Sequence, residues 1–326
     1  MRITVLSGGI GGARYLAGLT ATVDPRDTSI TVVANTADDI WLFGLRICPD
    51  LDTVMYTLGG AIDEERGWGR DRETWHAKAE LAAYGVEPTW FGLGDKDIAT
   101  HLVRTQMLNA GYSLSAVTEA LCVRWRPGVR LIPMTDDRVE THVVIDDPDA
   151  EGGRRAVHFQ EYWVRLHAPP AHSVVAVGAE ESAPAPGVVE AIHETDVLIV
   201  APSNPVVSIG TVLAVPGIVE AIQTTSAAVV GVSPIIAGAP VRGMADKLLP
   251  LLDVEVSARG VAAHSGSRRD GGLLDGWLVD DADAAAVPDI QALGLEARAV
   301  PLYLTDRAAS AALAGETLTL AHGLDR

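Results

Sequence analysis

Cysteine and long apolar runs are scarce in this sequence. Its two cysteines, Cys48 and Cys122, lie far apart without paired spacing, so we expect inert core thiols and neither a disulfide framework nor a cysteine–histidine zinc site. No stretch approaches the ~18 uninterrupted apolar residues that cross a bilayer. Met1 leads directly into an apolar strand without a signal-type segment. We therefore expect a cytoplasmic protein that has no membrane partner.

Positive charge is scarce as well. The chain has 25 lysine and arginine residues against 43 aspartate and glutamate residues, and lysine occurs only at Lys78, Lys96 and Lys247. With a formal net charge of −18, nucleic acid is not an expected partner, because affinity for it begins with neutralised phosphates. The negative field also repels small anions. A phosphorylated substrate would therefore need a helix N-terminus, a few basic residues or a divalent cation beside it.

Short apolar runs, each followed by a turn with Gly, Ser or Pro, recur along the chain. They cover residues 3–6, 29–34, 174–177, 197–200 and 227–232. Their continuous hydrophobicity is typical of parallel strands that are covered on both faces. The sequence therefore predicts an α/β fold with a Rossmann-like, doubly wound, mostly parallel sheet and a smaller, mainly helical second domain. The expected core spans 1–59 and 129–280, the helical insertion beside the acceptor site 60–128, and a C-terminal segment packing on the core 281–326.

A glycine-rich segment, SGGIGGAR (7–14), joins the first predicted strand to a helix. Glycine lets the backbone approach a ligand, and a helix N-terminus offers free N–H groups to phosphate. The spacing of these glycines does not match the dinucleotide fingerprint G-x-G-x-x-G, and the lysine of a P-loop is missing. A tight turn that binds nothing is the alternative interpretation.

Acidic residues gather after the second predicted strand, in NTADDIWLFGLRICPDLDT (35–53). Asp38, Asp39, Asp50 and Asp52 follow the end of that strand, where ligand sites of such sheets lie. Neighbouring carboxylates repel one another, so a cation or hydrogen-bond donors should be close. Mg²⁺ suits a site of carboxylates and phosphate oxygens. Alternatively, these residues only cap a helix and order a turn.

Two further segments place polar residues near predicted strand ends. They are GLGDKDIATHLVR (92–104), with its lysine and arginine, and PSNPVVSIG (202–210), and each could also be only a turn or cap. The sequence lacks the G-x-S-x-G elbow and the H-E-x-x-H motif, and it shows no covalent nucleophile. Four tryptophans, at positions 68, 75, 90 and 125, could wall a flat ring or pack in the interior. The residues alone thus predict a nucleotide or phosphate site with a carboxylate-held metal, serving phosphoryl transfer or binding.

Eight segments, in order, resemble the CofD/FbiA family of 2-phospholactate or phosphoenolpyruvate transferases of coenzyme F420 biosynthesis, most of all its actinobacterial branch. They are SGGIGGAR, NTADD, CPDLDTVMYTLGG, RGWGRDRETW, GDKDIATHLVRTQML, HFQEYWVR, APSNPVVSIG and GVSPIIAG. The resemblance implies a homodimer that requires Mg²⁺. It also implies a guanylylated phosphoenolpyruvate or 2-phospholactate as donor and the deazaflavin Fo (8-hydroxy-5-deazariboflavin) as acceptor, with release of GMP.

The resemblance also assigns roles to matching residues. It implies Asp50 and Asp52 as catalytic residues and Asp39 and Asp50 as metal ligands. Fo would be bound by Asp52, Thr53, Asp95, Lys96, Thr100 and Arg104. The nucleotide would be bound by Ser7, Gly8, Gly9, Gly11, Gly12, Asn35, Ser203, Asn204, Ser208 and Ser233. An aspartate near a ribityl hydroxyl can remove its proton or bind the metal. The sequence does not decide which of these two roles belongs to Asp50 and which to Asp52.

A non-enzymatic regulator that binds a nucleotide-sugar, as in the related YvcK-like proteins, is the alternative function. That branch shares the opening glycines but typically has D-D-G-G-S-S-G where this chain has Asp38-Asp39-Ile40-Trp41, and it lacks the PDLDT element. Both differences favour the transferase. A dinucleotide-dependent oxidoreductase is disfavoured by the glycine spacing. The sequence shows no residue that must distinguish an enolpyruvyl from a lactyl donor.

Overall fold

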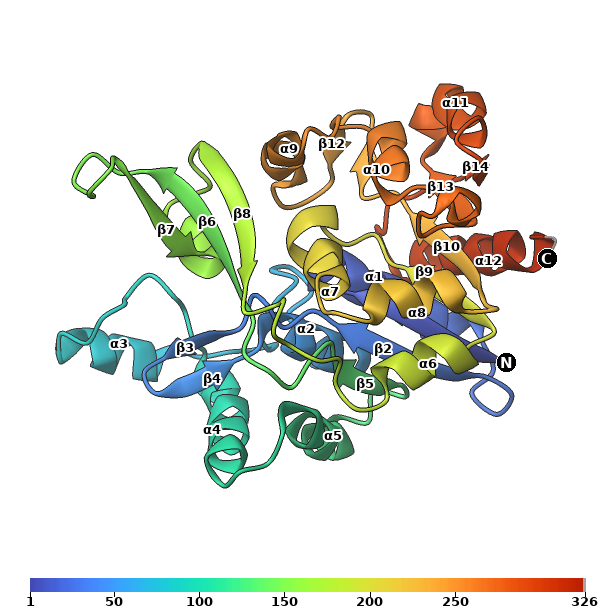
Figure 1. Cartoon of the computed structure of the whole chain (residues 1–326). Helices are drawn as coiled ribbons and strands as arrows, with labels where there is room; N and C mark the ends of the chain where they lie inside the picture. Colours follow the sequence, from blue (N-terminus) through green and yellow to red (C-terminus); the bar gives the residue numbers. More distant parts are fainter. Residues whose placement is uncertain (325–326) are drawn as a thin grey trace.

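A seven-stranded parallel sheet forms the centre of the molecule (Figure 1). The computed structural model describes residues 1–324 and gives the strand order β14-β13-β10-β9-β1-β2-β5. The strands are β1 (Arg2–Ser7), β2 (Ser29–Ala34), β5 (Arg130–Pro133), β9 (Val197–Val200), β10 (Ala228–Val232), β13 (Gly276–Val279) and β14 (Glu296–Ala299). All six neighbouring pairs are parallel. The predicted Rossmann-like α/β class is confirmed.

Helices cover both faces of this sheet because successive strand residues point to opposite sides. On one face, Val5 packs in a buried apolar cluster with α1 (Gly9–Thr22), α2 (Pro49–Leu58), α5 (Leu114–Trp125) and α12 (Arg307–Gly323). On the other face, Leu6 packs in a second buried cluster with further helices. These are α6 (Val188–Glu194), α7 (Gly210–Leu213), α8 (Ile218–Thr224), α9 (Ala245–Leu248), α10 (Ala258–Ser265) and α11 (Val287–Gln291). The strand order reverses between β1 and β9, and ligands of doubly wound sheets bind at such a switch point.

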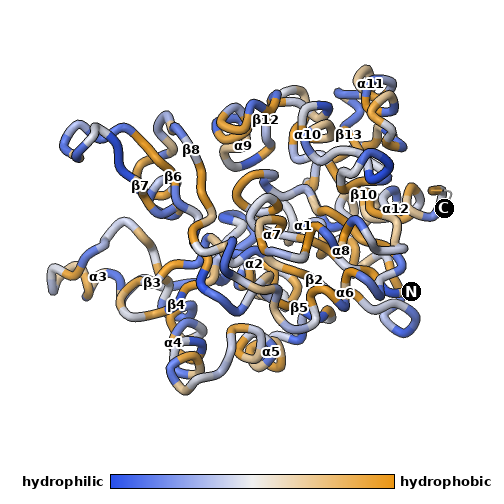
Figure 2. Tube along the Cα trace, in the orientation of Figure 1, coloured by the Kyte–Doolittle hydropathy of each residue, from blue (hydrophilic) through white to orange (hydrophobic). Residues whose placement is uncertain are grey.

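A second, three-stranded sheet lies apart from the main one in Figure 1. It consists of β6 (Glu140–Asp146), β7 (Arg154–His158) and β8 (Ala171–Val177), all paired antiparallel. The prediction that residues 174–177 form a strand of the parallel core was therefore wrong. Figure 2 shows β8 as a strongly hydrophobic segment, yet Val175 and Val177 are about half exposed, at 50% and 51%. A continuous apolar run thus does not require burial on both faces.

Residues 60–128 contain α3 (His76–Ala83), α4 (Asp95–Asn109) and α5. Helix α5 buries Leu114, Val117 and Leu121 in the same cluster as the central strands, so it covers the main sheet. Helices α3 and α4 lie beside the hairpin of β3 (Ile40–Leu42) and β4 (Leu45–Ile47), away from the main sheet (Figure 1). The division into domains stays a prediction.

The described part of the C-terminal segment packs on the sheet and also extends it. Strand β14 pairs with β13 at one edge, and α12 lies along α1. The approach is so close that a Cβ on Gly18 would collide with the backbone of Ser310. This segment therefore completes the central layer.

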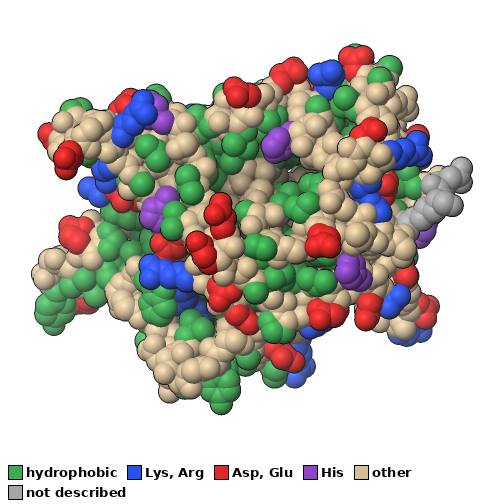
Figure 3. All heavy atoms as spheres, viewed as in Figure 1, with side chains coloured by type: hydrophobic (Ala, Val, Ile, Leu, Met, Phe, Trp, Pro, Cys, Tyr) green, Lys and Arg blue, Asp and Glu red, His purple; other side chains and the backbone are tan. Residues whose placement is uncertain are grey.

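The remaining short elements connect these layers. They are the strands β11 (Ile235–Ile236) and β12 (Ala239–Pro240), the π-helical turns Glu161–Arg165 and Pro205–Ile209, and the 3-10 turns Leu249–Leu252, Arg268–Asp270 and Asp281–Ala286. Within residues 1–324, no single helix has both the length and the apolar composition of a membrane span. The bent pair Pro205–Leu213 and Ile218–Thr224 meets that test only jointly, by length and composition alone. The face seen in Figure 3 carries scattered acidic side chains, in keeping with the net charge of −18.

Candidate functional site

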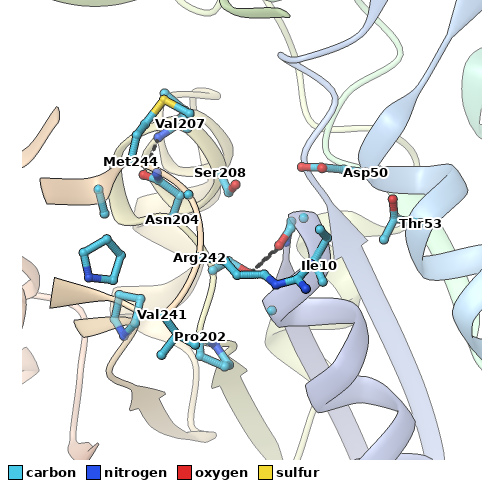
Figure 4. A pocket seen from close by; sticks show the side chains of 18 of the residues that line it. Ile10, Asp50, Thr53, Pro202, Asn204, Val207, Ser208, Val241, Arg242 and Met244 are labelled. Carbon is cyan, nitrogen blue, oxygen red and sulfur yellow. Dashed lines mark hydrogen bonds between the residues drawn. The ribbon is translucent and has the colours of Figure 1, made fainter. Parts of the chain in front are cut away.

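A cavity of about 670 Å³ opens at the switch point, next to the carboxyl ends of β1 and β9 (Figure 4). This volume falls in the range of small-molecule and cofactor sites. Its walls come from the turn between β1 and α1, the first turn of α2, the segment after β9 and the segment 233–245. Residues 159–164 and 302–305, together with Arg66, Trp68 and Phe91, complete the wall. Segments far apart in the sequence therefore meet in one space.

The glycines of the first turn allow three segments to touch. A Cβ on Gly8 would lie 2.6 Å from Cβ of Ser208 and 2.7 Å from Oδ2 of Asp50. A Cβ on Gly11 would collide with the carbonyl oxygen of Pro202. The N–H of Gly8 donates to Oγ of Ser203 at 3.0 Å, and that hydroxyl donates back to the Gly8 carbonyl at 2.7 Å. The turn thus needs glycine for close packing, and Asp50 and Ser208 are held against the N-terminus of α1.

The predicted nucleotide-binding residues divide into two groups. Those that line the cavity are Gly8, Gly9, Gly11, Ser203, Asn204, Ser208 and Ser233. Ser7, Gly12 and Asn35 are not among the lining residues, and Ser7 and Asn35 are fully buried. Asn204 caps the helical turn that follows it, and Ser233 accepts from the N–H of Ile235, so both also order local backbone.

Asn35 connects the acidic cluster to the segment after β9. Its Nδ2 donates to Oδ2 of Asp50 at 3.0 Å and to the carbonyl of Val207 at 3.2 Å. Its Oδ1 accepts from Oγ1 of Thr211 at 2.8 Å and from the N–H of Ala37. Because both polar atoms of this side chain form hydrogen bonds within the protein, Asn35 acts as a positioning residue for Asp50.

Asp38 and Asp50 are the two aspartates of the acidic cluster that line the cavity. Burial, together with the charge of Asp50, raises the pKa of Asp38 well above its usual range. Burial also raises the pKa of Asp50 to about 6, although hydrogen bonds from Asn35 and the Gly9 backbone oppose the rise. Oδ1 of Asp38 is buried and has no hydrogen-bond partner among the described residues. Two mutually repelling carboxylates therefore face the ligand space.

Asp39 and Asp52 do not line the cavity, because each pairs with a buried arginine. Asp39 accepts from Arg46 at 3.0 Å, and Asp52 makes a short ion pair with Arg104. Burial raises the pKa of Asp39 to about 6 and also raises that of Asp52, while the arginines oppose both shifts. For Asp50 and Asp52 the difference follows from helix geometry, because residues two apart point to different sides of α2.

The other predicted acceptor residues are also spread over the structure. Thr53 lines the cavity, whereas Asp95, Lys96, Thr100 and Arg104 do not. Asp95 accepts from the backbone N–H groups of His76 and Ala77 and so caps α3. The Nζ of Lys96 donates to the backbone carbonyls of Asp71 and Arg72. Their part in binding Fo stays a prediction that the observed contacts do not require.

Two groups of side chains could hold a cation. Asp52, Asp97 and His101 offer ligand atoms within 4.8 Å of one another, but the guanidinium of Arg104 already contacts Asp52 and supplies positive charge there. Asp38 and Asp50 have no arginine ion-pair partner among residues 1–324, and they offer only oxygen atoms. Mg²⁺ prefers one or two carboxylates together with substrate phosphates. Asp38 and Asp50 therefore fit Mg²⁺ better than the predicted pair of Asp39 and Asp50.

Several cavity residues were not predicted from the sequence. They are Arg14, Arg66, Phe159, Gln160, Trp163 and Arg242. Asp38 was part of the predicted acidic cluster, without an assigned role. Arg66 forms an ion pair with Asp63 and lies over the rings of Trp68 and Trp75. Of the four predicted ring-wall tryptophans, Trp68 lines the cavity, whereas Trp75, Trp90 and Trp125 do not. The sequence could have indicated two of these arginines, because Arg14 and Arg66 belong to the segments SGGIGGAR and RGWGRDRETW.

Comparison with known proteins identifies the family. The family model described as "2-phospho-L-lactate transferase CofD" matches residues 3–300. Proteins named "Phosphoenolpyruvate transferase" are similar over 98% of this chain: one from Streptomyces coelicolor is 66% identical and one from Thermobifida fusca 61%, each over 98% of its own length. A similarly named protein from Nocardia farcinica is 57% identical, over 95% of its length.

The fold has solved counterparts as well. A crystal structure of a upf0052 family member from Bacillus halodurans superposes with a TM-score of 0.63 at 17% identity, covering 97% of this chain and 99% of that one. At such low identity the likeness shows the fold alone. The family match and the close relatives decide the identity: this chain belongs to the CofD family.

Proposed function

We propose that this chain is a Mg²⁺-dependent transferase that moves a phosphoenolpyruvyl or 2-phospholactyl group from a guanosine-diphosphate-linked donor to the deazaflavin Fo and releases GMP. The observation that carries the proposal is that a helix N-terminus and two buried carboxylates line one cavity at the switch point, and that neither carboxylate has an arginine ion-pair partner among residues 1–324. The helix terminus suits the phosphates of the donor. The names of the relatives, "Phosphoenolpyruvate transferase", favour the enolpyruvyl donor over the lactyl one.

The reaction is a displacement at phosphorus. The ribityl hydroxyl oxygen of Fo forms a new bond to the phosphorus that carries the three-carbon acid, and the bond from that phosphorus to the GMP oxygen breaks. Such a step needs alignment and charge neutralisation more than a covalent nucleophile. The free N–H groups at the start of α1 would bind the phosphate oxygens as negative charge moves to GMP.

Asp50 is the proposed proton acceptor. Its pKa of about 6 makes it largely ionised at neutral pH and well matched to general-base work. Asn35 orients it by donating to Oδ2, which leaves the other oxygen for the hydroxyl of Fo. Asp38 and Asp50 would hold Mg²⁺, which, when bound, neutralises phosphate charge. In this assignment Asp52 positions α2 through Arg104 and does not touch the substrate.

Product analysis tests the proposal. Purified protein, Mg²⁺ and Fo are incubated with each guanylylated donor, and the products are identified by mass spectrometry. The enolpyruvyl and lactyl products differ by two hydrogen atoms, so one spectrum identifies the donor. Formation of neither product, together with a thermal shift from a nucleotide-sugar, would contradict the transferase and support the regulator. A homodimer is proposed as well, and light scattering of the eluting protein measures its mass.

A further inference from the structure

Two guanidinium groups line the cavity beside α1 without an ion-pair carboxylate among residues 1–324. Arg14 lies in α1, and its closest hydrogen bond reaches the carbonyl of Glu64 at 3.5 Å. Arg242 lies between β12 and α9 and donates to the carbonyl of Arg66 at 3.1 Å. Within the described chain, neither guanidinium has a carboxylate at ion-pair distance. The hydrogen bonds of both guanidinium groups therefore go to backbone oxygens, and Glu64 acts on Arg14 only from beyond ion-pair distance.

The two groups lie close enough to influence each other. Burial and the charge of Arg242 both lower the pKa of Arg14, while the charge of nearby Glu64 opposes the shift. Figure 4 shows the side chain of Arg242 reaching across to Ile10 at the start of α1. A Cβ on Gly67 would lie 3.0 Å from Nη1 of Arg242 and 3.1 Å from Cγ2 of Ile10, so this glycine makes room for the guanidinium. The arrangement seats a cation against a helix N-terminus.

Such a placement has an electrostatic cost that an anion would offset. Like charges repel, and the positive end of the α1 dipole adds to the repulsion. Other arginines at or near the site are neutralised, since Arg46 pairs with Asp39, Arg104 with Asp52 and Arg66 with Asp63. In a chain with 43 acidic residues, two unpaired arginines in one cavity indicate a position for an anionic ligand.

We propose that Arg14 and Arg242 form an anion subsite that binds the carboxylate of the transferred three-carbon acid. The subsite rests on the proposed function. Arginine presents a planar fork of donors that matches a carboxylate in two parallel hydrogen bonds. The N–H groups of α1 that follow Gly9 in its first turn are available for the nucleotide phosphates, whereas Asp38 and Asp50 repel any anion that arrives without a cation. Once the phosphates are assigned to α1, the carboxylate is the other negative group of the donor. Among the described residues that line the cavity, Arg14 and Arg242 are cations without an ion-pair carboxylate and can bind it.

Binding of the reaction product separates this subsite from the rest of the site. The product carries the three-carbon acid, whereas Fo does not, so we compare both ligands by quenching of deazaflavin fluorescence. For Arg242→Met and for Arg14→Met we expect the product to bind about tenfold to a hundredfold more weakly, as for a lost charge-assisted pair. Binding of Fo by fluorescence, and of GDP by calorimetry, should stay within about twofold of wild type.

Two further variants complete the test. Arg242→Lys keeps the charge but loses the fork, and should give an intermediate loss for the product. Arg269→Met, which removes one exposed positive charge elsewhere, is the matched control and should bind all three ligands normally. Melting temperatures check that each variant folds.

Each result bears on the subsite. Unchanged product binding in both methionine variants would overturn it, and an equal loss for GDP would assign the arginines to the nucleotide phosphates instead. If the wild-type protein forms no product from either donor, the proposed function fails and the subsite fails with it. If it does form product and the variants bind that product normally, only the subsite fails.

Discussion

The charged side chains near the two sides of helix α2 differ in whether they have an ion-pair partner. On the cavity side, Asp38 and Asp50 have no arginine partner and Arg14 has no carboxylate partner within the described chain. On the inner side, Asp52 pairs with Arg104, and neighbouring His101 lies within 3.7 Å of that carboxylate. Breaking a buried ion pair leaves an uncompensated charge, so the inner side serves stability. The charges on the cavity side lack partners because, we infer, the ligands supply them.

The largest expected effect is on catalysis, from Asp50→Asn. We expect the transfer rate to fall by about 10²–10⁴, the usual share of a general base. Steady-state rates with Fo, together with circular dichroism, measure this loss in a folded protein. A variant that turned over normally would remove Asp50 from the reaction.

The next effect is on stability, from Arg104→Met on the inner side of α2. This change leaves the buried carboxylate of Asp52 without its partner and should cost about 3–5 kcal/mol of unfolding free energy. Denaturant unfolding measures it, with Arg269→Met as the control for loss of an exposed charge. A loss below about 1 kcal/mol, typical of exposed pairs, would show that the pair is not truly buried.

The unfolding free energies of Asp50→Asn and Asp52→Asn, measured at several pH values, test this contrast between the two sides of α2. The raised pKa of Asp50 means that the folded state holds its proton more tightly than the unfolded chain does, so this group's stabilising contribution is lost as pH rises from about 4 to about 6. Asp50→Asn should therefore gain roughly 1–3 kcal/mol relative to wild type over that window.

The pKa of Asp52 is raised as well, but Asp52→Asn also leaves Arg104 buried without its anion. That loss costs about 3–5 kcal/mol and should outweigh the gain, so this variant should be destabilised at pH 7. Unfolding curves at pH 4 and pH 7 measure both differences. If the two variants shifted in the same direction at pH 7, the contrast between the sides of α2 would fail.

The smallest effect is expected from Asp95→Ala. Its carboxylate caps α3 through two backbone N–H groups, and loss of such a cap costs about 1 kcal/mol. Binding of Fo, followed by fluorescence, should stay within about twofold of wild type because the residue does not line the cavity. Strong loss of Fo binding would instead support the assignment that the sequence resemblance implied.

The sequence alone determined the fold class and the approximate place of the site. Continuous apolar runs before Gly- and Ser-rich turns predicted a parallel sheet, and carboxyl ends of parallel strands meet at one edge. Periodicity failed at residues 174–177, because an apolar run looks the same whether one face or two faces are covered. The resemblance identified the family from segment order.

Only the tertiary structure decided how the aspartates are divided and which arginines join the site. Ion pairs with Arg46 and Arg104 hold Asp39 and Asp52 away from the cavity, while Asp38 and Asp50 line it. Arg242 reaches α1 from more than two hundred residues away in sequence, across a glycine that makes room for it. Spacing along the chain does not encode such contacts, because they depend on which side chains find a partner when the segments pack.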